Sequence, residues 1–161
     1  MAECQGMKSH RTGFAKATIL LTAILASGSV PAHEHATGLT AERMQVMKDM
    51  ASHMKALAAM LDGRAPYDAQ AARRHALALH ESCHEMAGQF PDASHDHHSR
   101  AAPAVWAQPE RFEAQMGNLG RVVTELVSAT ASGQRGIVRQ RFLEVGRACA
   151  SCHETFRLPE H

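Results

Sequence analysis

The chain lacks three features that would point to common classes of binding protein. It has few aromatic residues, with one Trp, one Tyr and five Phe among 161 residues, and 17 Lys and Arg balance 16 Asp and Glu. A near-neutral chain without a basic run offers no electrostatic basis for binding nucleic acid or a membrane surface. Its longest apolar run, residues 17–26, is about half the roughly 20 residues that a transmembrane helix needs.

The beginning of the chain is typical of a secretory signal peptide. A basic stretch precedes the apolar run, and the small-residue stretch "SGSVPA" at 27–32 follows it. We expect cleavage after Ala32, which leaves residues 33–161 as one exported, periplasmic domain. An uncleaved anchor is the alternative, and the short apolar run disfavours it.

Cysteine is also scarce, and its number in the expected domain is odd. Cys4 lies in the leader, so Cys83, Cys149 and Cys152 remain. Exported chains meet an oxidising compartment, where thiols either pair or are used. An odd count argues against a simple disulfide framework.

The expected domain is all-α, because Ala, Leu and Met abound and β-branched alternation is almost absent. Breaks rich in Gly, Pro and polar residues fall at 62–68, 89–109 and 131–136. Thr40 and Asp68 are expected N-caps, and Pro109 suits a first helical position.

Each of the four segments between these breaks carries an apolar stripe that steps by threes and fours. The stripes are Met47, Met50, Met54, Leu57 and Leu61; Ala72, Ala76, Leu79, Cys83, Met86 and Phe90; Phe112, Met116, Leu119, Val123, Leu126 and Thr130; and Val138, Phe142, Val145, Cys149, Cys152 and Phe156. Such stripes line the inner faces of packed helices. With two short connections and one long one, they predict an antiparallel four-helix bundle.

The sequence "CASCH" at 149–153 is the Cys-x-x-Cys-His pattern of covalent c-type haem attachment. Cys149 and Cys152 lie on one helical face, where each thiol can bond a vinyl group of the porphyrin. His153 follows Cys149 by four residues, so its imidazole can bind the iron. A redox dithiol would need a βαβ setting, and a zinc knuckle would need two more ligands, neither of which the sequence offers.

The whole expected domain resembles the cytochrome c′ family, the class II c-type cytochromes. "VGRACASCHETFR" at 145–157 is similar to that family's haem segment, and 39–57 is similar to its first helix. "GRAPYDA" at 63–69 resembles its first turn, and "VWAQPERF" at 105–112 resembles the approach to its third helix. The resemblance implies one covalently attached haem c in an antiparallel bundle.

The resemblance also implies residues on the other side of the iron. In this family the residue four after the first-helix Arg faces the distal side of the haem, and here these residues are Arg43 and Met47. Low-spin members have a Met ligand at that position, while five-coordinate, gas-binding members commonly have an apolar side chain. By resemblance Met47 is the sixth ligand, Arg43 contacts a haem propionate, and Arg157 borders the proximal side.

Other interpretations of these residues remain open from the sequence alone. Met is a common core-filling residue, so Met47 could be part of the apolar stripe and no more. His53 is a weak competitor because it lies off the stripe. Arg157 could simply be a solvated cation at a helix end.

A second copy of Ser-Cys-His-Glu occurs at 82–85 without a Cys three residues before Cys83. That position is His80, so two-thioether attachment is excluded, and Cys83 is expected to be a small buried side chain. His80 and His84 have metal-like spacing, but two ligands are too few for a closed site, which favours a solvated face.

Two further His-rich stretches have possible metal roles. Residues 94–100 ("SHDHHSR") contain three histidines and are expected to be a solubilising loop, although such tracts can bind metal. Cleavage after Ala32 would expose His33-Glu34-His35, whose amine, backbone nitrogens and third-position His could chelate Cu(II).

The sequence therefore predicts a periplasmic monohaem cytochrome that carries electrons between redox partner proteins and is not an enzyme. A low-spin iron with His153 and Met47 as ligands suits this role, because little reorganises on electron transfer. The alternative is a five-coordinate cytochrome c′ that binds nitric oxide or carbon monoxide. A metal-binding bundle is a third interpretation, and the family resemblance leaves a homodimer open.

Overall fold

The computed structural model describes residues 36–91 and 98–159. The expected signal peptide at 1–32 and the stretch His33–His35 lie outside the described residues, as does most of the His-rich stretch. Within the described part, no helix is long and apolar enough to cross a membrane.

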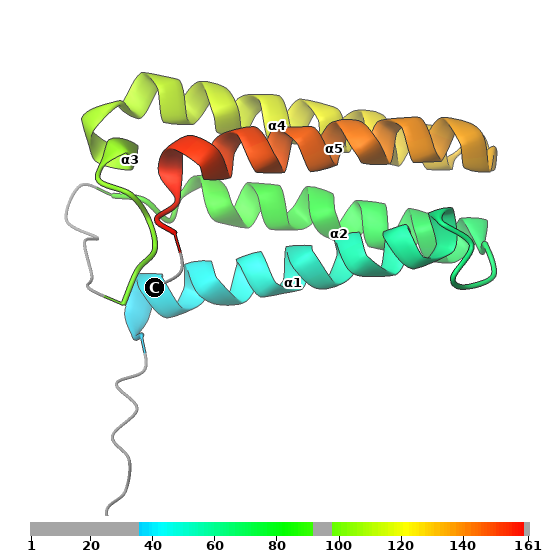
Figure 1. Cartoon of the computed structure of the whole chain (residues 1–161), viewed down its shortest axis with the longest axis horizontal. Coiled ribbons are helices and arrows are strands. Elements are labelled where there is room, and N and C mark those ends of the chain that lie inside the picture. Colours follow the sequence, from blue (N-terminus) through cyan, green and yellow to red (C-terminus); the bar gives the residue numbers. More distant parts are fainter. Residues whose placement is uncertain (1–35, 92–97, 160–161) are drawn as a thin grey trace, which may run out of the picture. The chain divides into compact units, whose positions relative to one another are not determined.

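Five helices make up the described fold: α1 (Gly38–Leu61), α2 (Ala69–Ala87), α3 (Ala104–Ala107), α4 (Pro109–Thr130) and α5 (Arg135–Phe156). The four long helices form the predicted antiparallel bundle, in which α1 packs against α2, α2 against α4, and α4 against α5 (Figure 1). Among the neighbouring pairs of long helices, α1 and α5 make the fewest contacts. Helix α3 is a single turn within the long connection and was not expected.

Two of the three predicted helix starts, at Asp68 and Pro109, are confirmed. The Asp68 carboxylate accepts hydrogen bonds from the backbone N–H groups of Gln70 and Ala71 at 2.8 and 3.0 Å, so it is the N-cap of α2. These bonds lower the Asp68 pKa. Pro109 begins α4 as predicted.

The prediction of Thr40 as an N-cap is wrong. Helix α1 begins at Gly38, so Thr40 lies inside its first turn. The Thr40 hydroxyl accepts a hydrogen bond from Arg43 Nη2 at 2.8 Å, and Thr40 is buried. Its hydroxyl therefore serves a buried guanidinium instead of the free backbone N–H groups of the helix end.

Three described glycines have positive φ angles that side chains disfavour: Gly38 begins α1 with φ +54°, and the other two lie in the short turns. Gly63 has φ +78° after α1, and Gly133 has φ +66° between α4 and α5. Glycine adopts this left-handed conformation without the steric cost of a Cβ atom. These turns let the chain reverse direction at the end of the bundle remote from α3 (Figure 1).

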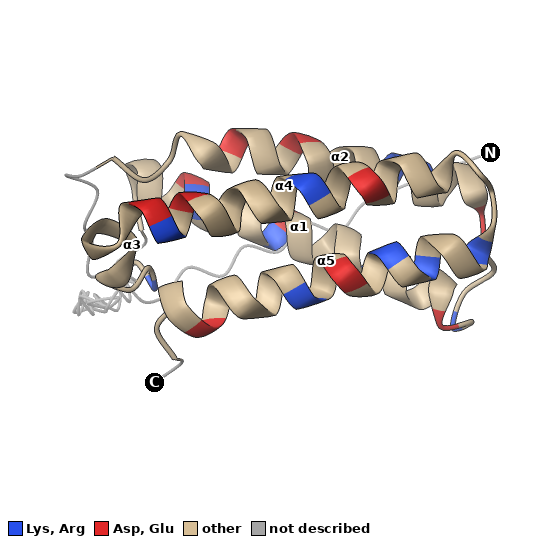
Figure 2. Cartoon of the chain, turned by 90° about the horizontal axis from the view of Figure 1, so that it is seen from above, with Lys and Arg blue, Asp and Glu red and all other residues tan. Residues whose placement is uncertain are grey.

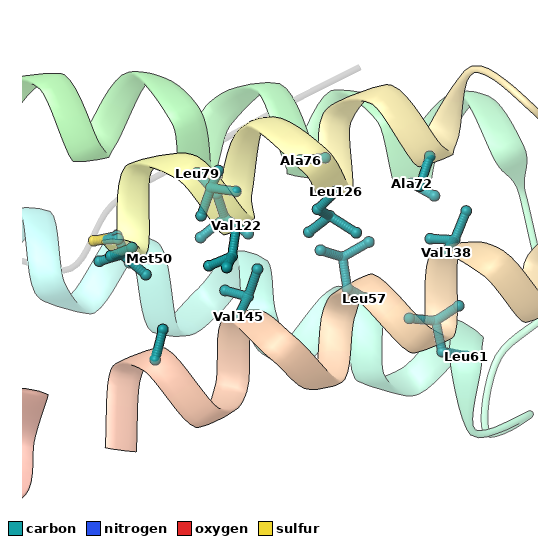
Figure 3. Packing of buried hydrophobic residues seen from close by; sticks show 14 of the residues in the cluster. Met50, Leu57, Leu61, Ala72, Ala76, Leu79, Val122, Leu126, Val138 and Val145 are labelled. Carbon is teal, nitrogen blue, oxygen red and sulfur yellow. The ribbon is translucent and has the colours of Figure 1, made fainter. Parts of the chain in front are cut away.

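The core forms where the four apolar stripes meet. Leu57, Leu79, Leu126, Val138 and Val145 are at most 1% exposed, and Figure 3 shows their side chains pointing toward one another. Cys83, Phe90, Phe142 and Cys149 are only partly buried but pack against this cluster. The predicted stripes thus form the interior of the bundle. The prediction that apolar residues repeating with the helical period of 3.6 are the buried ones is confirmed.

The outer surface carries charges of both signs along the helices (Figure 2). An example joins α4 and α5, where Arg141 forms ion pairs with Glu125 at 3.1 Å and with Glu144 at 2.7 Å. Exposed pairs of this kind contribute little stability. The mixed charges agree with the near-neutral composition.

Candidate haem site

A cavity of about 430 Å³ opens at the end of the bundle where α1 begins and α5 ends. Figure 1 shows these two helix ends and α3 at the same end of the bundle. The wall comes from the first half of α1, residues 98–105, the beginning of α4 and the end of α5. Val105 on α3 and Phe112 and Met116 on α4 give it an apolar side.

The described lining of the cavity holds cations but no carboxylate. The cations are Arg43, Lys48, Arg100 and Arg157. An apolar cavity with cations in its wall suits a flat apolar molecule with acidic substituents, because the ring can leave water while its carboxylates find positive partners. Haem has this combination of an apolar macrocycle and two propionates.

The predicted haem segment lies in the last turns of α5. Cys152 and His153 line the cavity, and both are partly buried. Cys149 lies one turn earlier, does not line the cavity, and packs against the core. Burial raises the pKa of both thiols, and Cys149 raises that of Cys152 further, so these two sulfurs lie within electrostatic reach of each other.

The imidazole of His153 is kept neutral by its surroundings. Burial lowers its pKa most, followed by the positive charges of Arg157 and Arg100. A neutral imidazole has the lone pair that metal coordination requires. Cys152 and His153 at the cavity wall, with Cys149 one turn earlier on the same helix, form a donor set that fits covalently attached haem.

Met47 lines the cavity, unlike most of the other methionines of α1. Met47 lines the cavity and is partly buried, whereas Met50 and Met60 are buried in the core. Met54 packs against the core and does not line the cavity. Met44 also lines the cavity but is 41% exposed, so Met47 and Met44 are the α1 thioethers at the haem site.

Arg43 is a buried cation in the cavity wall, only 5% exposed. Its guanidinium donates to the Gln89 carbonyl oxygen at 2.9 Å and to Ser99 Oγ at 3.4 Å, in addition to Thr40. It also lies 4.9 Å from the centre of the Phe90 ring. These contacts place a fixed positive charge beside the cavity and join the beginning of α1 to the end of α2.

The connection before α3 is paired with the residues after α5. The Leu158 backbone N–H donates to the Arg100 carbonyl oxygen at 2.8 Å, and the Ala102 N–H donates to the Phe156 carbonyl oxygen at 2.9 Å. The Arg100 side chain also donates to the Leu158 carbonyl oxygen. Ala101 and Arg157 thus form an isolated antiparallel bridge that completes one side of the cavity.

Several lining residues could not be singled out from the sequence. Arg100 and Val105 come from the long connection, where no periodic pattern marks them. Phe112 and Met116 lie on the predicted stripe of α4, so their burial was expected, but their place in the cavity was not. Nothing in the sequence predicted that Lys48 would line the cavity, except that it directly follows Met47.

The first Ser-Cys-His-Glu copy lies next to the haem segment in space. Cys83 packs against the core as predicted, and burial followed by the neighbouring Cys149 raises its pKa to about 11. It does not line the haem cavity. It lines a second cavity of about 350 Å³ that shares Phe112 and Met116 with the first.

His80 and His84 also line this second cavity, and their rings meet edge to face with centroids 4.7 Å apart. His98, the described histidine of the His-rich stretch, lines the haem cavity instead. Among the described residues, no three His, Cys, Asp or Glu side chains gather in a way that could hold a metal ion. The solvated-face interpretation of His80 and His84 stays a prediction.

His53 does not compete for the haem. It lies away from the cavity lining, and its Nδ1 atom lies 3.1 Å from Nδ1 of His75 on α2. Burial, the charge of His53 and the charge of Arg74 lower the pKa of His75. Nothing in the sequence marked His75 or predicted that it would pair with His53.

Comparison with known proteins decides the family. The family model described as "Cytochrome C'" matches residues 38–157, which contain the whole described bundle. The chain belongs to the cytochrome c′ family. It therefore holds one covalently attached haem c, and the predicted fold and cofactor are confirmed.

The relatives of this cytochrome include proteins named cytochrome c-556 and proteins named cytochrome c′. A cytochrome c-556 of Agrobacterium tumefaciens (strain II Chrys) is 31% identical over 121 residues, which cover 75% of this chain and 98% of the relative. A cytochrome c′ of Pararhodospirillum photometricum is 31% identical over 116 residues, 71% of this chain and 92% of the relative.

Among solved structures, cytochrome c′ from Rubrivivax gelatinosus aligns with a TM-score of 0.68 at 28% identity. The alignment covers 71% of this chain and 91% of that protein. This likeness agrees with the arrangement of the four long helices.

Proposed function

We propose that this cytochrome is an electron carrier whose haem iron has His153 and Met47 as its axial ligands. The observation that carries the proposal is the position of Met47, which lines the same cavity as His153 from a different helix. A neutral imidazole and a thioether are an axial pair found in electron-transfer cytochromes.

Each ligand contributes a different property. Burial and the nearby arginines Arg157 and Arg100 lower the pKa of His153, which favours the neutral imidazole whose lone pair can bind iron. The thioether of Met47 is soft and uncharged, and such a ligand raises the reduction potential. The bound haem supplies the one-electron chemistry.

The remaining wall positions the cofactor and limits water. Arg43 is fixed by its contacts with Thr40 and Gln89, so it can hold a propionate without first becoming ordered. Phe112, Met116 and Val105 offer apolar surface on one side of the cavity, against which the macrocycle would displace water. A preformed site from which haem displaces water favours electron transfer, because little solvent reorganises with the change in charge.

Absorption spectra of the ferric and ferrous protein, with and without carbon monoxide, test the ligand assignment. We expect low-spin spectra in both states that carbon monoxide does not change. Met47→Leu should give a high-spin spectrum and allow carbon monoxide to bind, because Leu removes the sulfur and keeps the bulk. Met44→Leu, the matched change of the exposed cavity-lining Met, should leave the spectra as they are.

High-spin spectra of the unaltered protein would refute the proposal, as would a Met47→Leu variant that remains low-spin. A loss of the low-spin state in Met44→Leu alone would transfer the ligand role to Met44.

The second candidate is a five-coordinate cytochrome c′ that binds nitric oxide or carbon monoxide. The relatives keep this candidate level with the first, because a protein named cytochrome c′ and one named cytochrome c-556 match this chain at the same 31% identity. In that case Met47 would cover the iron without binding it, and the carbon monoxide test would give the opposite result.

The cellular setting belongs to the same proposal. The leader-like residues 1–32 support export to the periplasm. Redox partner proteins would meet the molecule where the haem edge is nearest the surface, at the end of the bundle that contains α3. We propose no reaction catalysed by the protein itself, and a homodimer remains a family-based expectation.

A further inference from the structure

His53 and His75 form a pair outside the haem cavity. His53 lies on α1 and His75 on α2, and both side chains are half-buried between these helices. The Nδ1 atoms face each other at 3.1 Å, with ring centroids 5.3 Å apart and planes inclined by 48°. Neither residue takes part in the haem site described above.

The distance between the two nitrogen atoms fits a shared metal ion. Zinc binds imidazole nitrogen at about 2.0–2.1 Å, so two such ligands in tetrahedral geometry lie about 3.3–3.4 Å apart. The observed 3.1 Å is within about 0.3 Å of this separation, so a small rotation of either ring would reach it. We propose that Nδ1 of His53 and Nδ1 of His75 bind one Zn²⁺ ion between α1 and α2, with water in the remaining positions.

The same geometry also permits a direct hydrogen bond, so the two states compete. In the hydrogen-bonded state one ring donates its Nδ1–H and the other accepts, whereas an ion needs a lone pair on both Nδ1 atoms. Each ring can meet this need by carrying its proton on Nε2. Binding therefore exchanges one hydrogen bond for two coordinate bonds and requires no movement of the helices.

The surroundings set the affinity. Among the described residues no carboxylate or thiol joins the pair as a third ligand, and the adjacent Arg74 adds positive charge. Two protein ligands without a compensating anion predict an affinity in roughly the micromolar range, far weaker than that of closed four-ligand sites.

His80 and His84 provide a matched comparison within the same protein. They are also a pair of histidines, but they lie four residues apart on the same helix, α2, and His84 is exposed. Their edge-to-face rings line the second cavity and do not bridge two helices. A general affinity of histidines for zinc would therefore affect both pairs, whereas the proposed site affects only His53 and His75.

Titration calorimetry of the purified holoprotein with Zn²⁺ tests the site, together with equilibrium dialysis and metal analysis. We expect one Zn²⁺ per chain. His53→Ala and His75→Ala should each weaken binding by at least about tenfold. A variant with both His80→Ala and His84→Ala should bind as tightly as the unaltered protein.

The fold of each variant is checked by its haem spectrum and far-ultraviolet circular dichroism, and His53→Gln replaces any alanine variant that unfolds. Bound Zn²⁺ should also raise the Tm of the unaltered protein but not that of the His53 and His75 variants. The proposal is overturned if no saturable binding occurs below about 1 mM. It is equally overturned if binding survives the loss of His53 and His75, because the ion would then lie elsewhere in the chain.

Discussion

Cys83 differs from the two haem cysteines in its chemical fate. Its pKa of about 11 keeps it a protonated thiol at neutral pH, and the thiolate is the form that reacts with disulfides and metals. By the proposed attachment, Cys149 and Cys152 are consumed when the haem is bound. Cys83 should therefore remain as a free thiol in the finished domain.

Counting thiols tests this difference. The denatured holoprotein should react with one equivalent of an aromatic disulfide reagent per chain, and Cys83→Ala should react with none while its haem spectrum is unchanged. In the native protein at pH 7 the reaction should be slow, because the thiol is half-buried and protonated. Two reactive thiols per chain would mean that one thioether bond is missing.

The sequence predicts most clearly the site residues whose role depends on neighbours only a few positions away. Cys149, Cys152 and His153 fall within one turn and a half of helix, so their spacing alone predicts an attachment site. Met47 required knowledge of a family, because four other methionines share its helix. Arg100 could not be found at all, since its place in the site depends on pairing with Leu158, 58 residues later.

Among the elements, α4 contains glycines that nothing in its packing requires. Gly117 lies within the helix, and a Cβ atom placed on it would meet no atom within 4 Å. Gly117→Ala should raise the free energy of unfolding by about 0.5–1 kcal/mol, because alanine loses less backbone entropy on folding. Urea unfolding followed by circular dichroism measures the change.

Gly133 is the matched control for this prediction. It also has open space around it, but its φ of +66° lies in the left-handed region. Gly133→Ala should therefore lower the free energy of unfolding by about 1–2 kcal/mol. If both variants change stability in the same direction, backbone conformation does not explain the effect.

Helix positions could be predicted because burial repeats with the helical period. The stripe residues Leu57, Leu79, Leu126 and Val145 are all buried, and Asp68 and Pro109 begin their helices as expected. The prediction for Thr40 was wrong because its hydroxyl can accept a hydrogen bond from a buried Arg as well as from the backbone N–H groups of a helix end. Helix α3 is four residues long, too short for any periodic pattern to mark it.

Contacts between elements could not be predicted in the same way. The His53 and His75 pairing depends on how far α1 is shifted along α2, and a stripe defines which face packs without defining that shift. The proximity of Cys83 to Cys149 similarly depends on how α2 and α5 are aligned.

At the scale of the whole molecule, a bound haem would extend the core into the open cavity of about 430 Å³. Without haem, water enters this cavity, and its apolar wall loses burial that is worth about 25 cal/mol per Å². Total stabilities of domains are only about 5–15 kcal/mol. The haem-free chain should therefore not keep a rigid bundle.

The variant with both Cys149→Ala and Cys152→Ala, purified without haem, tests this expectation. It should unfold at a lower urea concentration and with a smaller m-value than the holoprotein, and should lose near-ultraviolet circular dichroism. Cys83→Ala, which removes a thiol and leaves the haem attached, should unfold close to the holoprotein. A haem-free variant as stable as the holoprotein would show that the bundle does not need its cofactor.

The bridge between Ala101 and Arg157 also bears on the order of assembly. It joins Ala101, before α3, to Arg157, directly after α5, so this side of the cavity is complete only when α4 and α5 have both packed. The segment that completes this wall directly follows the two cysteines and the histidine on α5. The docking of the segment proposed to carry the cofactor and the closure of the site around it are therefore one step of folding.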